Sequence, residues 1–308
     1  MVMFMLRITK NIEEANLITH ASKFHADEVF ATAFLSRFIE NPVVCRVNVV
    51  PDNIRDDQIV YDIGFGKFDH HMKDFDERHG SGVKYAAFGL IFREYGMKYL
   101  ESIDLNSAPI AFNMIEHEVV ECVDAIDNGE FPEINTVYAY KALDGIIADY
   151  NACWDENVDN DKYFMEAYEF AYTYLDKVIK RTYAKIRARS EVEGAIGLSK
   201  DHIMYLDKYM PFKDIVVASS NPKALDIYFA ITPSNRGGYN IHTIPINKNT
   251  HETRMDFPAE WGGLADEELQ KVSGVKSATF CHSGLFLAAC GTIEDAYLMA
   301  RLAIEHNN

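Results

Sequence analysis

The sequence has few cysteines and no long hydrophobic run. Its five cysteines show no CxxC spacing, so they predict reduced thiols rather than a disulfide framework or a structural zinc finger. No stretch reaches the roughly 18 apolar residues of a membrane-spanning helix. The beginning, MVMFMLRITK, carries its basic residues after the apolar run, which is unlike a signal peptide. We therefore expect a cytoplasmic protein that makes no membrane contact.

Basic residues are also scarce. Lys and Arg number 30 against 47 Asp and Glu, which gives a formal net charge of −17. Such a surface repels long polyanions, so nucleic acid must be held in a locally neutralised cleft or through bound cations. This excludes a general DNA-coating protein. The length of 308 residues and the hydrophobic fraction of 48% favour two compact domains over a disordered chain.

The first half of the chain alternates between strand and helix patterns. Strands are predicted at residues 16–20, 43–50 and 58–63, with a helix at 27–40. Residues 83–127 have a helical pattern with a break near 104–107, and residues 161–193 form one long helical segment. The alternation predicts an α/β fold with a largely parallel sheet flanked by helices, whose ligands lie at the strand ends.

The second half has a different pattern of apolar and turn residues, which predicts a smaller, mixed α/β domain. Its expected strands are residues 203–206, 215–218, 225–231 and 239–246, and its expected helices are residues 266–272 and 292–305. We place the two domains at residues 1–195 and 196–308.

Histidines and carboxylates gather in four short motifs. These are THASKFHADE (residues 19–28), YDIG (61–64), FDHH (68–71) and DAIDNG (124–129). Four of the eleven histidines lie in the first and third motifs. Histidine and carboxylate ligands together suit Mn²⁺, Fe²⁺ or Zn²⁺.

The positions of these residues strengthen the prediction of a metal site. His20 and Asp62 end predicted parallel strands, and His25 and Asp27 are two residues apart before a helix. Each motif alone also fits an ordinary solvated surface, because residues three apart share a helix face. The presence of all four motifs, in this order along the chain, favours a two-metal site in which Asp62 bridges the cations.

The four motifs resemble the DHH phosphoesterase superfamily. More closely, they resemble the melanocyte-proliferating-gene family, whose N-terminal pattern is TH-x-G-x-FH-x-DE. Three later segments resemble the family's P-x-x-WRGL, VSG and F-x-H-x-x-GF: PAEWGGL (258–264), VSG (272–274) and FCHSGLF (280–286). Gly262 stands where the family has arginine, and the paired glycines that follow the last segment in the family are missing here.

The resemblance implies roles for particular residues. Those implied as metal ligands are His25, Asp27 and Asp62, with His20 at the site edge and Asp127 or, in reserve, Asp124. His70 and His71 would lie near the scissile phosphate, with Asp69 orienting them. The C-terminal domain would bind substrate, and its candidates are Arg254, His282, Ser283 and Gly284. Arg254 and His282 fit equally well as an exposed strand residue and a core histidine.

The function that the resemblance implies is that of a metal-dependent phosphodiesterase. It would be a 3′→5′ exonuclease on RNA or short oligonucleotides, in which two divalent cations, expected to be Mn²⁺, activate a water. Two alternatives stay open: a small-molecule phosphoesterase or pyrophosphatase, and a metal-stabilised nucleotide-binding protein with little turnover. The sequence leaves undecided the physiological metal, RNA against DNA, the cleavage polarity, and whether the chain forms a homo-oligomer.

Overall fold

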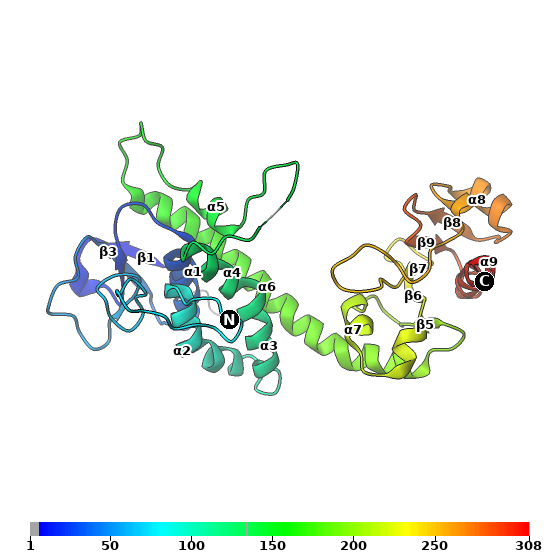
Figure 1. Cartoon of the computed structure of the whole chain (residues 1–308), viewed down its shortest axis with the longest axis horizontal. Coiled ribbons are helices and arrows are strands. Elements are labelled where there is room, and N and C mark those ends of the chain that lie inside the picture. Colours follow the sequence, from blue (N-terminus) through cyan, green and yellow to red (C-terminus); the bar gives the residue numbers. More distant parts are fainter. Residues whose placement is uncertain (1–5, 134, 308) are drawn as a thin grey trace. The chain divides into compact units, whose positions relative to one another are not determined.

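The computed structural model describes residues 6–133 and 135–307 and divides into two compact units (Figure 1). Unit 1 is Met1–Tyr183 and unit 2 is Ala184–Asn308. The division falls within the long helix α6 (Asn160–Leu198), which begins in unit 1 and ends in unit 2. The expected boundary after residue 195 lies in the same helix. The assignment of catalysis to one domain and of substrate binding to the other stays a prediction.

Unit 1 is built on a parallel four-stranded sheet. The strand order is β1-β3-β2-β4, with strands Arg7–Thr9, Val43–Val47, Leu17–His20 and Ile59–Val60. All three pairings are parallel, and His20 lies opposite Val47 at the carboxyl edge. Leu17 and Ile18 are fully buried, as expected where both faces of a parallel sheet are covered. The predicted parallel sheet is confirmed, whereas β1 was not anticipated.

Helices pack against this sheet and against one another. They are η1 (Ile12–Glu14), α1 (Ala26–Leu35), α2 (Ala87–Glu101), α3 (Ala108–Ile115), the π-helical turn η2 (Glu116–Val120), α4 (Glu121–Asp127) and α5 (Leu143–Ala148). Every residue of α1 is buried, because α2, α4 and α5 all contact it. The predicted break near 104–107 is confirmed by the gap between α2 and α3.

Unit 2 contains a mixed five-stranded sheet in the order β5-β6-β7-β9-β8. The strands are Ile203–Tyr205, Phe229–Pro233, Tyr239–Thr243, Leu287–Cys290 and Ala278–Cys281. β5 runs parallel to β6, and the other neighbours are antiparallel. The helices are α7 (Lys213–Ala218), η3 (Pro222–Asp226), η4 (Ala259–Trp261), α8 (Asp266–Ser273) and α9 (Ile293–Asn307). The expected α/β fold is confirmed for both units.

Two details of unit 2 differ from the sequence-based expectation. Residues 215–218 were expected to form a strand but belong to α7, and residues 225–226 belong to η3 rather than to a strand. A short apolar run does not distinguish a strand from a buried helical turn, and this is the physical reason for the error. The strands β8 and β9 were not predicted.

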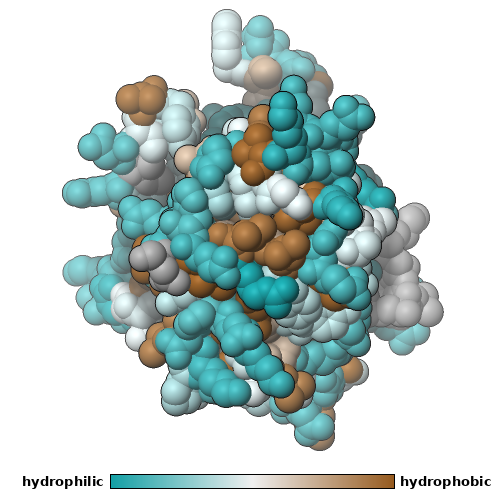
Figure 2. Space-filling model, turned by 90° about the vertical axis from the view of Figure 1, so that its right-hand side faces the viewer, coloured by the Kyte–Doolittle hydropathy of each residue, from teal (hydrophilic) through white to brown (hydrophobic). Residues whose placement is uncertain are grey.

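The surface is mostly hydrophilic in the view of Figure 2, with hydrophobic side chains gathered near its centre. Within residues 6–133 and 135–307, no helix combines the length and the hydrophobicity needed to cross a membrane.

Candidate metal centre

Three chain segments bring histidines and carboxylates to the carboxyl edge of the unit 1 sheet. β2 ends at His20, α1 begins directly after His25, and Asp62 follows β4. Asp62 adopts a left-handed backbone conformation with φ of 57°, which aspartate tolerates better than most residues. The chain reverses next at Gly64, with φ of 87°, and returns through the DHH triplet. The turn thereby places Asp62 and His70 beside each other.

Asp27 lies in the first turn of α1 with its carboxylate fully buried. Neither of its oxygens has a hydrogen-bond partner among the described residues, and the same is true of Asp62 Oδ1 and His70 Nδ1. Burial of an unpaired carboxylate is costly unless a positive charge beside it compensates for its own charge. Carboxylate oxygens and an imidazole nitrogen aimed at one another fit a divalent cation.

The pKa shifts of the buried carboxylates follow from this crowding. Burial, together with the charges of Asp62 and Asp127, raises the pKa of Asp27 well above its usual value. Burial also raises the pKa of Asp62, although the hydrogen bond from His20 opposes the shift. The pKa of Asp127 is lowered, because His70 and its hydrogen bond outweigh burial. A bound cation would relieve the repulsion that raises the first two.

The potential ligand atoms form overlapping groups, in each of which all atoms lie within 4.8 Å of one another. One group is His25, Asp27 and Asp127, and another is Asp62, Asp69, His70 and His71. Two further groups join them, namely His20 with His25 and Glu28, and Asp27 with Glu28 and Asp62. Because Asp27 and Asp62 each belong to two groups, the arrangement offers room for more than one cation.

The histidines of the cluster are held by carboxylates. His70 Nε2 lies 2.9 Å from Asp127 Oδ2, and its Nδ1 lies 3.8 Å from Asp62 Oδ1. His20 Nε2 lies 2.9 Å from Glu28 Oε1 and 3.2 Å from Asp62 Oδ2. Burial lowers the pKa of His20, but these two carboxylates outweigh burial and raise the pKa to about 11. Without a metal, the His20 cation thus neutralises part of the acidic cluster.

Asp69 has a different environment from the other carboxylates. Its Oδ2 accepts a hydrogen bond from the Phe65 amide at 2.7 Å, and its Oδ1 accepts one from the His71 amide at 3.0 Å. His71 Nδ1 also lies 2.7 Å from Oδ1. Burial raises the pKa of Asp69, but these hydrogen bonds outweigh it and lower the pKa to about 2. Asp69 is therefore a fully charged anchor that orients the His71 ring.

Glu28 belongs to the cluster but was given no role in the sequence analysis. Its buried carboxylate accepts the His25 amide hydrogen with both oxygens at 2.9 Å and also contacts His20. The signal that could have revealed it is a capping box, in which the third residue of a helix reaches back to the residue before the helix.

Asp124 does not join the cluster. Its Oδ2 lies 2.9 Å from His79 Nε2, and its Oδ1 accepts the Gly89 amide hydrogen at 3.0 Å. A Cβ at Gly89 would lie 1.8 Å from Oδ2, so this contact requires glycine. His79 Nδ1 lies 3.1 Å from Glu116 Oε1 in the π-helical turn. Of the two aspartates that the sequence left as alternatives, Asp127 is the one that lies among the potential ligands.

The substrate-binding candidates lie in unit 2. Arg254 Nη1 donates to the carbonyl oxygens of Ala224 and Ile227, the latter at 3.0 Å, and so holds the end of η3. His282 Nδ1 accepts the Gly284 amide hydrogen at 2.9 Å within a turn, where Ser283 and Gly284 are exposed. Their roles toward a substrate stay predictions.

Comparisons with known proteins place the chain in a family. A family model named MYG1_exonuc, described as "Uncharacterised protein family (UPF0160)", matches residues 16–304. The MYG1 protein of Dictyostelium discoideum is 27% identical over 94% of this chain and 96% of its own length. The MYG1 exonuclease of Homo sapiens is 27% identical over 93% of this chain and 85% of its own length. A MYG1 protein of Chlamydia pneumoniae is 29% identical over 93% of this chain and 96% of its own length. No solved structure matches. The match over most of the chain confirms the resemblance to the melanocyte-proliferating-gene family, and the chain belongs to the MYG1_exonuc family (UPF0160).

Proposed function

We propose that this chain is a metal-dependent exonuclease that hydrolyses phosphodiester bonds of RNA or short oligonucleotides in the 3′→5′ direction, with two Mn²⁺ ions as cofactors. The observation that carries the proposal is the set of buried, unpartnered ligand atoms on Asp27, Asp62 and His70. The names of the human and mouse relatives, both MYG1 exonucleases at 27% identity, support the same class of reaction.

The residues that would hold the cations are four members of the ligand groups, His25, Asp27, Asp62 and Asp127, with His20 and Glu28 at the edge. When bound, a cation pair supplies charge neutralisation at a phosphate and a more acidic water.

His70 and His71 would have different roles in the site. The side chain of His71 is 55% exposed, and Asp69 holds its Nδ1, so its Nε2 is free to donate a hydrogen bond to a phosphate oxygen. The hydrogen bond with Asp69 raises the pKa of His71, which favours this charged, donating form. His70 is 7% exposed and lies against Asp127, so it is placed to hold that carboxylate in position.

The net charge of −17 favours short substrates, whose few phosphates this local set of groups can neutralise. For the same reason, hydrolysis of small phosphoanhydrides or nucleotides is the second candidate among the hydrolase functions. An exonuclease leaves a ladder of shortened products from an oligomer, whereas a pyrophosphatase releases inorganic phosphate from pyrophosphate.

The test is degradation of an end-labelled short RNA by metal-stripped protein, with and without Mn²⁺. We expect a product ladder from the unmodified chain with Mn²⁺ and none from Asp62→Asn. The exposed Asp52 provides a matched control, because Asp52→Asn removes the same charge from unit 1 away from the cluster. A ladder that persists in Asp62→Asn would contradict the mechanism. Tight nucleotide binding without any product would favour the binding-protein alternative.

A further inference from the structure

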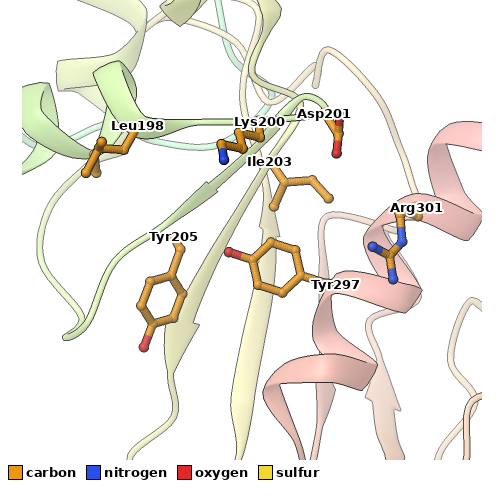
Figure 3. Close-up of a pocket in the computed structure, with 8 residues that line it drawn as sticks. Leu198, Lys200, Asp201, Ile203, Tyr205, Tyr297 and Arg301 are labelled. Atoms are coloured by element: carbon orange, nitrogen blue, oxygen red, sulfur yellow. The ribbon is translucent and has the colours of Figure 1, made fainter.

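Unit 2 contains a cavity of about 440 Å³ that is lined by none of the metal-cluster residues and none of the substrate-binding candidates (Figure 3). It lies between the carboxyl end of α6, the edge strand β5 and the helix α9. Cavities of roughly 300–1,000 Å³ are the usual size for small-molecule sites. The side chains on which the argument depends are Lys200, Asp201, Ile203, Tyr205, Tyr297 and Arg301.

Two cationic side chains and one carboxylate line the cavity. Within the described part of the chain, the side chains of Lys200 and Arg301 have no hydrogen-bond or ion-pair partner. Together with the carboxylate of Asp201, they leave the cavity with one net positive charge, in a chain whose formal net charge is −17. An anion with several oxygens, such as a phosphate, is the kind of group that lysine and arginine side chains bind.

The remaining walls suit a planar ring. Tyr297 reaches from α9 toward Tyr205 of β5, and Ile203 lies above them in the view of Figure 3. Burial, together with the neighbouring Tyr205, raises the pKa of Tyr297, so its phenol stays neutral. Aromatic side chains of this kind stack on nucleobases irrespective of base identity. The carboxylate of Asp201 at the rim is an acceptor for hydroxyl groups of a sugar.

We propose that this cavity binds a nucleoside monophosphate, with the phosphate on Lys200 and Arg301 and the base against Tyr205 and Tyr297. The inference goes beyond the proposed nuclease activity and does not depend on it, because none of the metal-cluster residues lines the cavity.

The experiment is calorimetric titration of the full-length protein, stripped of metal with a chelator, with AMP, adenosine and inorganic phosphate in separate runs. Removal of metal keeps phosphate from binding through cations at the unit 1 cluster. We expect AMP to bind more tightly than either fragment, since only AMP contacts both the cations and the tyrosines.

Variants locate the site. Arg301→Gln removes a charged hydrogen bond and should weaken AMP binding about tenfold or more. Tyr205→Ala should weaken it about fivefold or more, and Tyr205→Phe, which keeps the ring, should not. The matched control is Lys271→Gln on α8, which removes an exposed cation of unit 2 away from the cavity. Circular dichroism of each variant checks that the fold persists.

Three results would overturn the proposal. They are absence of AMP binding up to about 5 mM, equal AMP affinity in Arg301→Gln and the unmodified chain, and inorganic phosphate binding as tightly as AMP. The RNA assay described above is a separate readout. An RNA ladder without AMP binding removes this proposal alone, and AMP binding without a ladder removes the nuclease proposal alone.

Discussion

Helix α4 carries two aspartates, each of which pairs with a histidine from an earlier segment at the same distance but in different surroundings. His70 Nε2 lies 2.9 Å from Asp127, and His79 Nε2 lies 2.9 Å from Asp124. The Asp124 carboxylate is enclosed by donors, because Gly89 and His79 each give it a hydrogen bond. The Asp127 carboxylate instead lies beside Asp27, whose oxygens have no partner among the described residues.

The difference shows how a carboxylate that stabilises the fold can be distinguished from a carboxylate that is available for function, even when both lie at the same distance from a histidine. A pair whose polar atoms are all satisfied holds the fold together, since removal of one partner leaves a buried charge. A pair that lies beside buried acceptor atoms without a hydrogen-bond partner leaves those atoms available to bind a cation. Asp124 and His79 form the first kind of pair and fasten α4, and α4 in turn presents Asp127 to the cluster.

The largest expected effect is on cleavage. Asp127→Asn should lower Mn²⁺-dependent hydrolysis of RNA at least about 100-fold, because a potential cation ligand is lost from the group that Asp127 forms with His25 and Asp27. Initial rates over a range of Mn²⁺ concentrations measure this. Full activity of Asp127→Asn would show that the two pairs do not differ in function.

The second expected effect is on stability. Asp124→Asn should lower the free energy of unfolding by about 3–5 kcal/mol, because the His79 ring, 0% exposed, would lose the charge of its closest partner. Urea denaturation without metal measures the change, and Asp127→Asn under the same conditions should lose less. Gly89→Ala offers a second approach, since its Cβ would displace the Asp124 carboxylate. Equal losses in Asp124→Asn and Asp127→Asn would refute the distinction.

Addition of metal should stabilise variants of the cluster and variants of the Asp124–His79 pair to different extents. At a free Mn²⁺ concentration about 100 times the dissociation constant, the free energy of unfolding should rise by about 2.7 kcal/mol. This increment should disappear in Asp27→Asn, whose buried carboxylate would no longer attract the cation. It should survive in Asp124→Asn if that variant folds. Thermal melts with Mn²⁺ and with chelator give both values, and an unchanged increment in Asp27→Asn would argue against the site.

A histidine of unit 2 extends the comparison to a residue that faces a cation instead of carboxylates. Burial, and to a lesser extent Lys213, lowers the pKa of His242 to about 4. Since the unfolded chain takes up the proton first, stability is lost as the pH falls from 6.5 toward 4. We expect a loss of about 1–2 kcal/mol at pH 5 relative to pH 7. His242→Gln should be less sensitive over this range, and urea denaturation at both pH values checks the difference.

Much of the histidine and carboxylate cluster of unit 1 could be predicted, because the sequence indicates where the strands end. The apolar run before His20 and the β-rich run before Asp62 indicate two strands, and the carboxyl ends of parallel strands meet at one edge. The preference for Asp127 over Asp124 came from the family resemblance and not from the periodicity of the sequence. Asp124 and Asp127 are three residues apart and share a helix face, so only the positions of His79 and Gly89 distinguish them.

The sequence by itself determined the α/β class, the parallel sheet of unit 1 and the group of residues that gathers at its edge, because periodicity and strand-end position are local properties. The tertiary structure decided which partner each polar atom has. It placed Glu28 beside His20, and it placed Arg254 on the backbone carbonyl groups near η3. It also formed the cavity of Tyr205 and Arg301 from segments about 100 residues apart. Such pairings depend on long-range packing, which no local pattern encodes.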